Sequence, residues 1–192
     1  MKLKYFIVVA LSLLLAGCSI HIEGSNLESP PPPTMPLEIA VVGDNPFDTI
    51  RNVTFITDNL ENIASAGPGA FDGLLIMHEH FEKAAGAEYK SFFKTTEYPV
   101  FFVGAENLLT AVFHDERLTL EDGAIDGFGA YVSGFVVTET KIQQWGFHIP
   151  DNATAREKNG DLITRIAKVL EDYARVKEHP GNEKVMIQDF NF

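Results

Sequence analysis

The stretch LEIAVVGDNP at residues 37–46 decides the fold class of this chain. Its first six residues are nearly all apolar, without the polar and apolar alternation of a half-exposed strand, which is typical of a strand buried on both faces. The turn-forming sequence Gly-Asp-Asn-Pro follows directly, so the strand is expected to end at Val42. A strand with two buried faces predicts helices on both sides of a mainly parallel sheet.

Three more apolar runs follow along the chain, at residues 53–57, 73–77 and 99–103. A short helix is expected at residues 60–64, with Asp58 as its capping residue, because an aspartate accepts hydrogen bonds from the first turn. Residues 79–94 carry aromatic and alanine side chains at helical spacing, which predicts one continuous helix with a buried face. Strands that alternate with helices predict an α/β fold, a three-layer sandwich on a mainly parallel sheet.

The second half of the domain has a different pattern. Residues 130–140 and 143–149 are rich in β-forming residues and little chain separates them, which predicts an antiparallel hairpin at one edge of the sheet. Thr154 and Glu157 have capping-box spacing and precede an apolar stripe at helical period, which predicts a long helix. The stripe consists of Leu162, Ile163, Ile166, Val169, Leu170, Tyr173 and Val176. The sequence His-Pro-Gly ends this helix and leaves residues 184–190 as a candidate final edge strand.

Between residues 37 and 104 the order of strands and helices resembles that of receiver and flavodoxin-like domains. This resemblance implies a parallel sheet with helices on both faces. The chain departs from the receiver pattern at the end of the third strand, where Met77 and His78 stand in place of a phosphorylatable aspartate. The resemblance therefore implies a fold and no phosphorelay chemistry.

The chain begins with a lysine-containing segment, an apolar run at residues 5–15 and its single cysteine, Cys18. A positive start, an apolar core too short to cross a bilayer comfortably and small residues before a cut are typical of an export signal. The sequence Leu-Ala-Gly-Cys that ends at Cys18 resembles the lipobox of bacterial lipoproteins. The resemblance implies diacylglyceryl transfer to the Cys18 thiol, removal of residues 1–17 and acylation of the new amino terminus, for example with palmitate. Such multiple acyl chains anchor a protein to a membrane permanently.

A stalk at residues 18–36 connects this lipid to a single domain at residues 37–192. Proline runs favour an extended polyproline conformation at about 3.1 Å per residue, so the stalk would reach roughly 50 Å. Residues 1–17 hold two lysines and no acid, so residues 18–192 carry 13 basic and 27 acidic residues, a formal net charge of −14. Such a surface repels nucleic acid and anionic headgroups, so we expect an envelope protein or a small ligand as the partner.

The residue after Cys18 bears on the destination within the envelope. Ser19 is not the aspartate that typically retains a lipoprotein at the inner membrane of Gram-negative cells. The resemblance therefore implies the outer membrane in a cell with two membranes, and the outer face of the plasma membrane in a cell with one.

Candidate ligand-binding residues follow each of the four predicted parallel strands. They are Asp44, Asp58, the pair His78 and His80, and Glu106. In open α/β sheets ligands bind beyond the carboxyl ends of the strands, so these side chains are expected to share one edge. Capping of the following helices explains the same polar residues without any ligand, and we keep both interpretations open at this point.

A metal site is the more specific hypothesis for the two histidines. In an extended segment, residues two apart point to the same side, so His78 and His80 would ligate one ion such as Zn²⁺. Asp44 or Asp58 would add a carboxylate ligand. If a helix begins at His78, however, the two imidazoles no longer share a face. A metal-binding protein or metal-dependent hydrolase is therefore the alternative to a binding domain that has no cofactor.

Other chemistries find less support in the sequence. The first strand is followed by one glycine and a proline, so it lacks the glycine-rich loop that cradles phosphates. Ser133 does not lie in the Gly-x-Ser-x-Gly pattern of a nucleophile elbow. His114 is expected at the solvated end of a helix, and Trp145 is expected to pack within the fold more than to form a ligand platform. The sequence thus predicts a membrane-anchored lipoprotein whose α/β domain binds a ligand or partner without catalysis.

Overall fold

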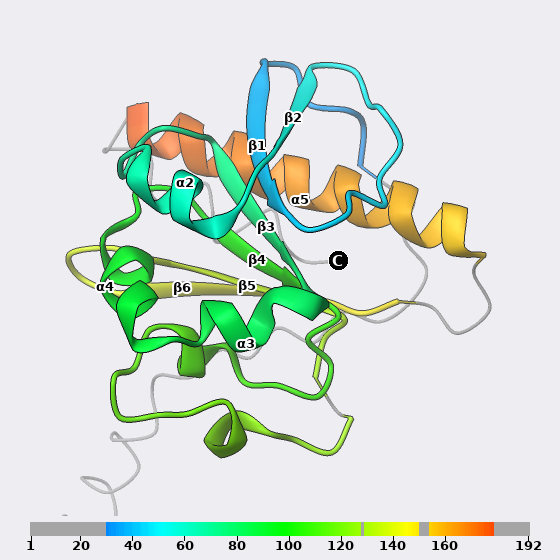
Figure 1. The fold of residues 1–192 in the computed structure, drawn as a ribbon. Coiled ribbons are helices and arrows are strands. Elements are labelled where there is room, and N and C mark those ends of the chain that lie inside the picture. Colours follow the sequence, from blue (N-terminus) through cyan, green and yellow to red (C-terminus); the bar gives the residue numbers. More distant parts are fainter. Residues whose placement is uncertain (1–29, 128, 150–153, 179–192) are drawn as a thin grey trace, which may run out of the picture.

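The computed structural model describes residues 30–127, 129–149 and 154–178 (Figure 1). Within these residues the chain is an α/β protein with a six-stranded mixed sheet in the order β2-β1-β3-β4-β5-β6. The strands are β1 (Leu37–Val42), β2 (Val53–Thr57), β3 (Gly73–Met77), β4 (Val100–Val103), β5 (Val132–Val137) and β6 (Ile142–Phe147). The first three have the bounds that the apolar runs predict.

The sheet is parallel over four strands and antiparallel over the last two. β1 pairs in parallel with both β2 and β3, and β3 pairs in parallel with β4. β5 then runs antiparallel to β4, and β6 antiparallel to β5. The predicted mainly parallel sheet with an antiparallel hairpin at one edge is therefore confirmed.

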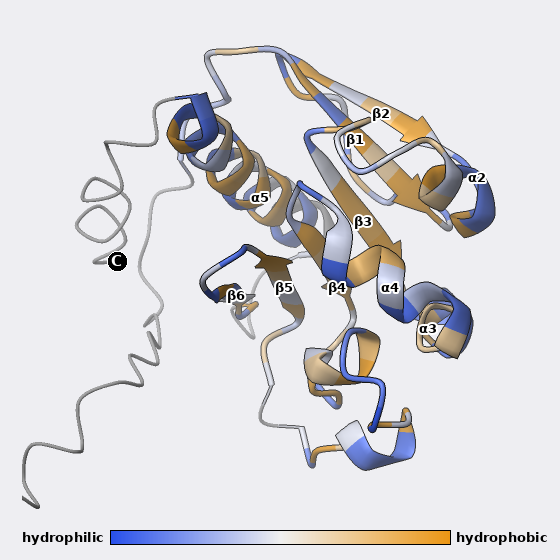
Figure 2. Cartoon of the chain, turned by 90° about the vertical axis from the view of Figure 1, so that its left-hand side faces the viewer, coloured by the Kyte–Doolittle hydropathy of each residue, from blue (hydrophilic) through white to orange (hydrophobic). Residues whose placement is uncertain are grey.

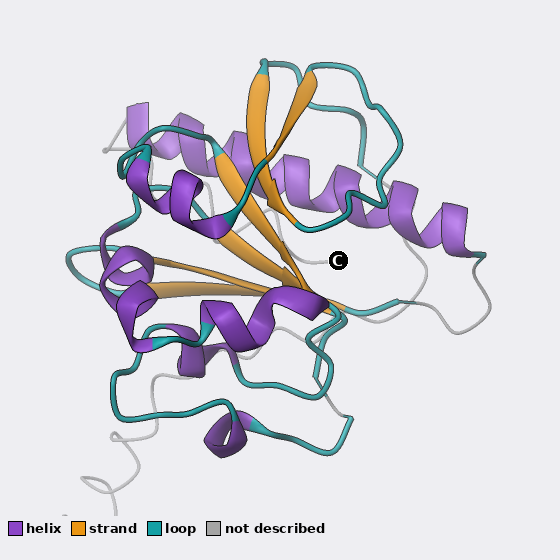
Figure 3. Cartoon of the chain, in the orientation of Figure 1, coloured by secondary structure: helices purple, strands orange, loops and turns teal. Residues whose placement is uncertain are grey.

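Helices pack on both faces of this sheet (Figures 1 and 3). Leu37, Ile39 and Val41 of β1 point to the face covered by α5 (Ala155–Glu178). Ala40 and Val42 point to the other face, which α2 (Leu60–Ser65), α3 (Phe81–Ala84) and α4 (Ala87–Thr95) cover. Hydrophobic residues accordingly dominate the buried strands β3 and β5 (Figure 2). The continuous apolar run of β1 is explained by burial on both sides.

The helix expected at residues 79–94 is interrupted, so that prediction was wrong. A 3₁₀ helix, η2 (His78–His80), comes first, and α3 and α4 follow on either side of Gly86. Gly86 has a non-helical backbone, with φ −57° and ψ 144°, and precedes the first turn of α4. Glycine loses more conformational freedom in a helix than any other residue, which favours a break at this position.

The capping residue of α2 also differs from the prediction. Asn59 is the N-cap, and its side-chain oxygen accepts a hydrogen bond of 2.9 Å from the backbone N–H of Asn62. The Asp58 carboxylate instead accepts from the backbone N–H of Asn59 and from the side-chain amide of Asn62, at 2.7 and 2.8 Å. Asp58 therefore supports the cap from one residue upstream.

The end of the predicted stalk packs against the domain. Pro33 is buried, and its carbonyl accepts a hydrogen bond of 2.9 Å from the side-chain amide of Asn52. The backbone N–H of Thr34 donates to the Glu171 carboxylate on α5 at 2.9 Å. The folded part thus includes residues 33–36, which the composition of the stalk had concealed. Cys18, the export signal and the strand expected at residues 184–190 lie outside the described residues.

The connection between β4 and β5 holds two 3₁₀ helices, η3 (Thr110–Phe113) and η4 (Glu121–Gly123). It is tied to α4 by Lys90, which is only 4% exposed and whose ammonium donates to the backbone carbonyls of Val112 and Leu118. Burial lowers the pKa of Lys90.

Within the described part of the chain, none of the helices combines the length and apolar character needed to cross a membrane.

Candidate ligand site at the carboxyl edge of the sheet

The carboxyl ends of β1 and β3 form a topological switch point. β1 lies between β2 and β3, so the chain leaves β1 toward one neighbour and later returns to its other side. Ligands of open α/β sheets bind in the crevice at such a point. The residues after β1 and β3 are therefore the first place to look for a site.

Gly43 brings these two strand ends into contact. It follows β1 with a φ of +109°, a conformation that side chains with a Cβ rarely adopt. A Cβ added there would lie 2.7 Å from Glu79 Oε1, 2.8 Å from Met77 Cβ and 2.9 Å from His80 Cδ2. The backbone after β1 therefore lies directly against the η2 turn that follows β3.

Gly104 forms a similar junction on the other side of η2. It follows β4 with a φ of +85°, and an added Cβ would lie 3.0 Å from the Cβ of His78. The η2 turn is thus held between two glycines, with His80 against Gly43 and His78 against Gly104. The ring of His78 also contacts the ring of Phe81, with a centroid separation of 5.2 Å.

The two histidines do not have the arrangement that the metal hypothesis requires. Its premise, an extended backbone from His78 to His80, is wrong because η2 begins at His78. A 3₁₀ helix has three residues per turn, so residues two apart point in different directions. Among the described residues, no group of three or more His, Cys, Asp or Glu side chains is arranged to hold a metal ion.

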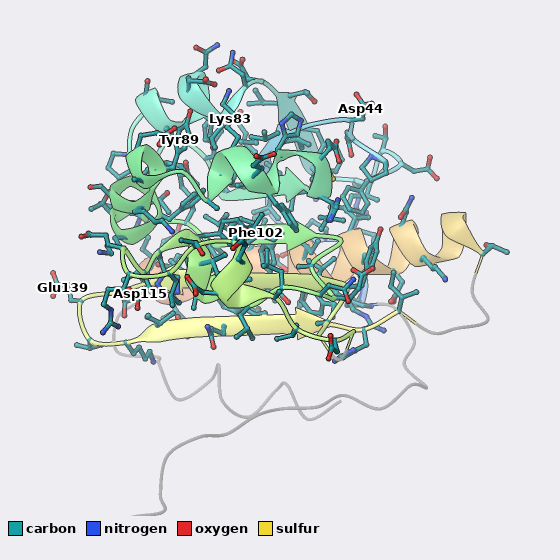
Figure 4. All side chains as sticks on the ribbon, turned by 60° about the horizontal axis from the view of Figure 1, so that its bottom comes forward. Asp44, Lys83, Tyr89, Phe102, Asp115 and Glu139 are labelled. Carbon is teal, nitrogen blue, oxygen red and sulfur yellow. The ribbon has the colours of Figure 1, made fainter. Side chains whose placement is uncertain are left out.

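The two aspartates lie on the same edge. Asp44 is exposed next to Gly43, and Figure 4 shows it at the surface, away from the buried Phe102. Asp58 is exposed after β2, and its backbone N–H donates to the carbonyl of Val41 at 3.1 Å. The Asp58 carboxylate supports the start of α2, which agrees with the interpretation that this residue serves helix capping. Asp44 remains a candidate for ligand contact.

Glu106 has a property that the sequence did not reveal. Its side chain is half-buried beyond β4, and its Oε2 is enclosed with no hydrogen-bond partner in the described part of the chain. Burial raises the pKa of the nearby Tyr131, and the charge of Glu106 raises it further. An enclosed carboxylate oxygen without a donor is unfavourable. Because this atom is closed to solvent, a ligand would reach it only after neighbouring groups move aside.

Two other candidates take structural roles. The rings of Trp145 and Phe147 lie 5.8 and 6.1 Å from that of Phe101, so both side chains pack within the α5 face. His114 follows η3 and presents its imidazole to the ring of Phe135 at 4.7 Å, and burial lowers the pKa of His114. The predicted packing of Trp145 is confirmed, whereas His114 is more enclosed than a solvated helix end.

The edge as a whole presents carboxylates to solvent. Asp44, Asp58 and Glu79 are exposed there, and Glu106 is half-buried. Such a surface attracts positive charge and supplies many hydrogen-bond acceptors.

A comparison with family models, curated proteins and solved structures finds no match to this chain.

Proposed function

We propose that this protein is a bacterial lipoprotein, anchored through Cys18, whose exported α/β domain binds a small ligand at the carboxyl edge of its sheet without catalysis. The observation that carries this proposal is the junction at Gly43, which brings the ends of β1 and β3 together at the switch point. Sites of this kind are where open α/β sheets bind their ligands.

A flavodoxin-like, three-layer architecture is part of the proposal. The order β2-β1-β3-β4 is the beginning of the flavodoxin-like strand order. Separate buried clusters lie on the two faces of the sheet, one with α5 and one with α2, α3 and α4. The antiparallel β5 departs from that pattern, since the flavodoxin-like fifth strand belongs to the parallel sheet.

The ligand we propose is a small organic cation, such as a primary amine. Carboxylates outnumber other charged groups at this edge, and the enclosed oxygen of Glu106 has no donor among the described residues, which an ammonium would supply. The net charge of −14 on residues 18–192 would also favour the approach of a cation. The alternative of a zinc protein that uses Asp44, His78 and His80 loses support because η2 separates the two imidazoles.

The anchor and stalk give this domain its place in the proposal. The lipid would hold the protein at the envelope, and residues 18–32 would keep the domain away from the bilayer. At about 3.1 Å per residue this shorter stalk would span roughly 45 Å. The ligand-binding edge would then be accessible to solutes outside the cytoplasm.

The proposal is tested by titrating the purified protein with spermidine and with ethanolamine in a calorimeter at low salt. We expect saturable binding of one ligand per chain, weakened at least tenfold by Glu79→Gln and by Glu106→Gln. Glu88→Gln and Glu121→Gln remove the same charge from exposed positions on α4 and η4, and should change the affinity less than twofold. Equal weakening by all four variants would instead indicate unspecific attraction to an acidic protein.

A further inference from the structure

A groove of about 850 Å³ lies at the opposite edge of the sheet from the candidate site. Its walls come from the loop before β4, from the turn of the β5–β6 hairpin and from the last turns of α5. In Figure 4 the hairpin residue Glu139 and the carboxyl-edge residue Asp44 lie on opposite sides of the molecule. The volume is within the range of 300–1,000 Å³ that is usual for ligand sites.

The groove suits a segment with both apolar and charged side chains. Val137, Val176 and Tyr173 supply its apolar surface. Three ammonium groups, including that of Lys141, and two carboxylates line it as well, so neither sign of charge dominates. Lys177 pairs with Glu97 at 2.7 Å, and Lys94 pairs with Glu116 at 2.6 Å. A small anion or cation would therefore gain little there, whereas a peptide of mixed charge would find partners for both signs in Lys141 and Glu139.

Ile142 provides a further reason to expect an occupant. It lies next to the groove at the start of β6 and is 47% exposed, which is high for a large aliphatic side chain in a strand. A peptide in the groove would cover this side chain.

The chain itself delivers such a peptide to this place. α5 ends at Glu178, one residue after Lys177 in the groove wall. Residues 184–190 have the sequence KVMIQDF, which combines four large apolar residues with one basic and one acidic residue. The six residues from Glu178 to Lys184 can span at most about 20 Å, and Lys177 of the groove wall lies next to their start, so this segment can reach the groove.

We propose that residues 184–190 of this chain occupy the groove between α5 and the β5–β6 hairpin. The groove is thus a peptide-binding surface, and its occupant is supplied in cis. This proposal is independent of the ligand site at the carboxyl edge. The apolar side chains of the segment cover Val137 and Val176, and Asp189 lies among the ammonium groups of the groove.

Topology argues against the simplest alternative, a seventh strand parallel to the free edge of β6. The crossovers from β2 to β3 and from β3 to β4 place their helices on one face, and α5 covers the other face. A crossover from β6 through α5 to a strand beyond β6 would therefore have the opposite hand to these two. Because parallel crossovers are right-handed in about 98% of cases, a seventh strand beyond β6 is disfavoured.

Disulfide cross-linking in the full chain tests this proposal. Cys18→Ser removes the single native cysteine, and Thr140→Cys is then combined in turn with Val185→Cys, Met186→Cys and Ile187→Cys. A disulfide forms only when the two Cα atoms approach to about 4.4–6.8 Å. We expect at least one pair to form an intramolecular disulfide in tenfold greater yield than the control pairs.

Each control pair combines one of the same three substitutions, at residue 185, 186 or 187, with Glu82→Cys. Glu82 is an exposed residue of α3, on the face of the sheet opposite to α5. Equal yields from the Thr140 and Glu82 pairs would overturn the proposal. A disulfide that joins two chains would overturn it as well, because the occupant would then come from a second copy.

The single tryptophan provides a second measurement that needs no cysteine. Trp145 is two residues from Gln143 of the groove wall, so it lies about 7 Å further along the same face of β6. We expect Ile187→Asp to expel the segment and to raise quenching of Trp145 by acrylamide about twofold. Asn191→Asp adds the same charge outside the segment and should leave quenching unchanged. Unchanged quenching in Ile187→Asp would contradict the proposal.

Discussion

Replacing Gly43 with alanine should destabilise the protein more than the same change at Gly67. The two glycines have nearly identical φ angles, +109° and +108°. Such a conformation costs a residue with a Cβ about 1–3 kcal/mol. The effect of the substitution on the unfolded chain cancels in part, because Pro68 already restricts the unfolded backbone at residue 67.

The two positions differ in what the new methyl group meets. At Gly67 no atom lies within 4 Å, whereas at Gly43 the methyl would lie 2.8 Å from Met77 Cβ, which the backbone of β3 fixes. Overpacking of this kind costs about 1–3 kcal/mol. We therefore expect Gly67→Ala to lower the free energy of unfolding by about 1–3 kcal/mol, and Gly43→Ala by about 2–6 kcal/mol.

Urea unfolding followed by circular dichroism measures both losses. In thermal unfolding the difference should appear as an additional decrease of about 2–4 °C for each kcal/mol. Equal losses for the two variants would refute the close contact between the end of β1 and the η2 turn. The candidate site would then lack the junction on which it depends.

Three further predictions concern stability. Burial lowers the pKa of His114 below its unfolded value of about 6.5, so stability should be highest above that pH and fall as the pH decreases through this value. His114→Phe should flatten this dependence in urea titrations between pH 7 and pH 5. Lys90→Met should lower the free energy of unfolding by about 1–3 kcal/mol, because it leaves two carbonyls without their donor. An unchanged urea midpoint would contradict that role. Gly134→Ala should cost about 1–3 kcal/mol, since its Cβ would lie 2.3 Å from the ring of Phe101, and a neutral result by the same assay would show that the ring can move away.

The strands could be predicted from the sequence because their burial leaves a direct pattern. The apolar runs of β1, β2 and β3 have their observed bounds, and the hairpin was expected close to where β5 and β6 lie. The break at Gly86 was missed because the aromatic spacing of residues 79–94 continues across it. Periodicity records which residues face the core, and two short helices on one face have nearly the same periodicity as a single helix.

The candidate site was less predictable than the fold. The shared edge follows from strand direction alone, so Asp44 and Glu106 could be named from the sequence. The contact between Gly43 and the η2 turn depends on how β1 and β3 twist and pack, which no local pattern records. The enclosed oxygen of Glu106 depends in the same way on its surroundings in the folded chain.

The central claim is that this is a lipoprotein with an exported binding domain, and mass spectrometry of the mature protein tests it most directly. The protein, purified from bacterial membranes, should begin at residue 18, and its first peptide should carry a diacylglyceryl group on the sulfur. Cys18→Ser should yield an uncleaved chain without lipid. A mature protein of normal size whose Cys18 has an unmodified thiol would contradict the account.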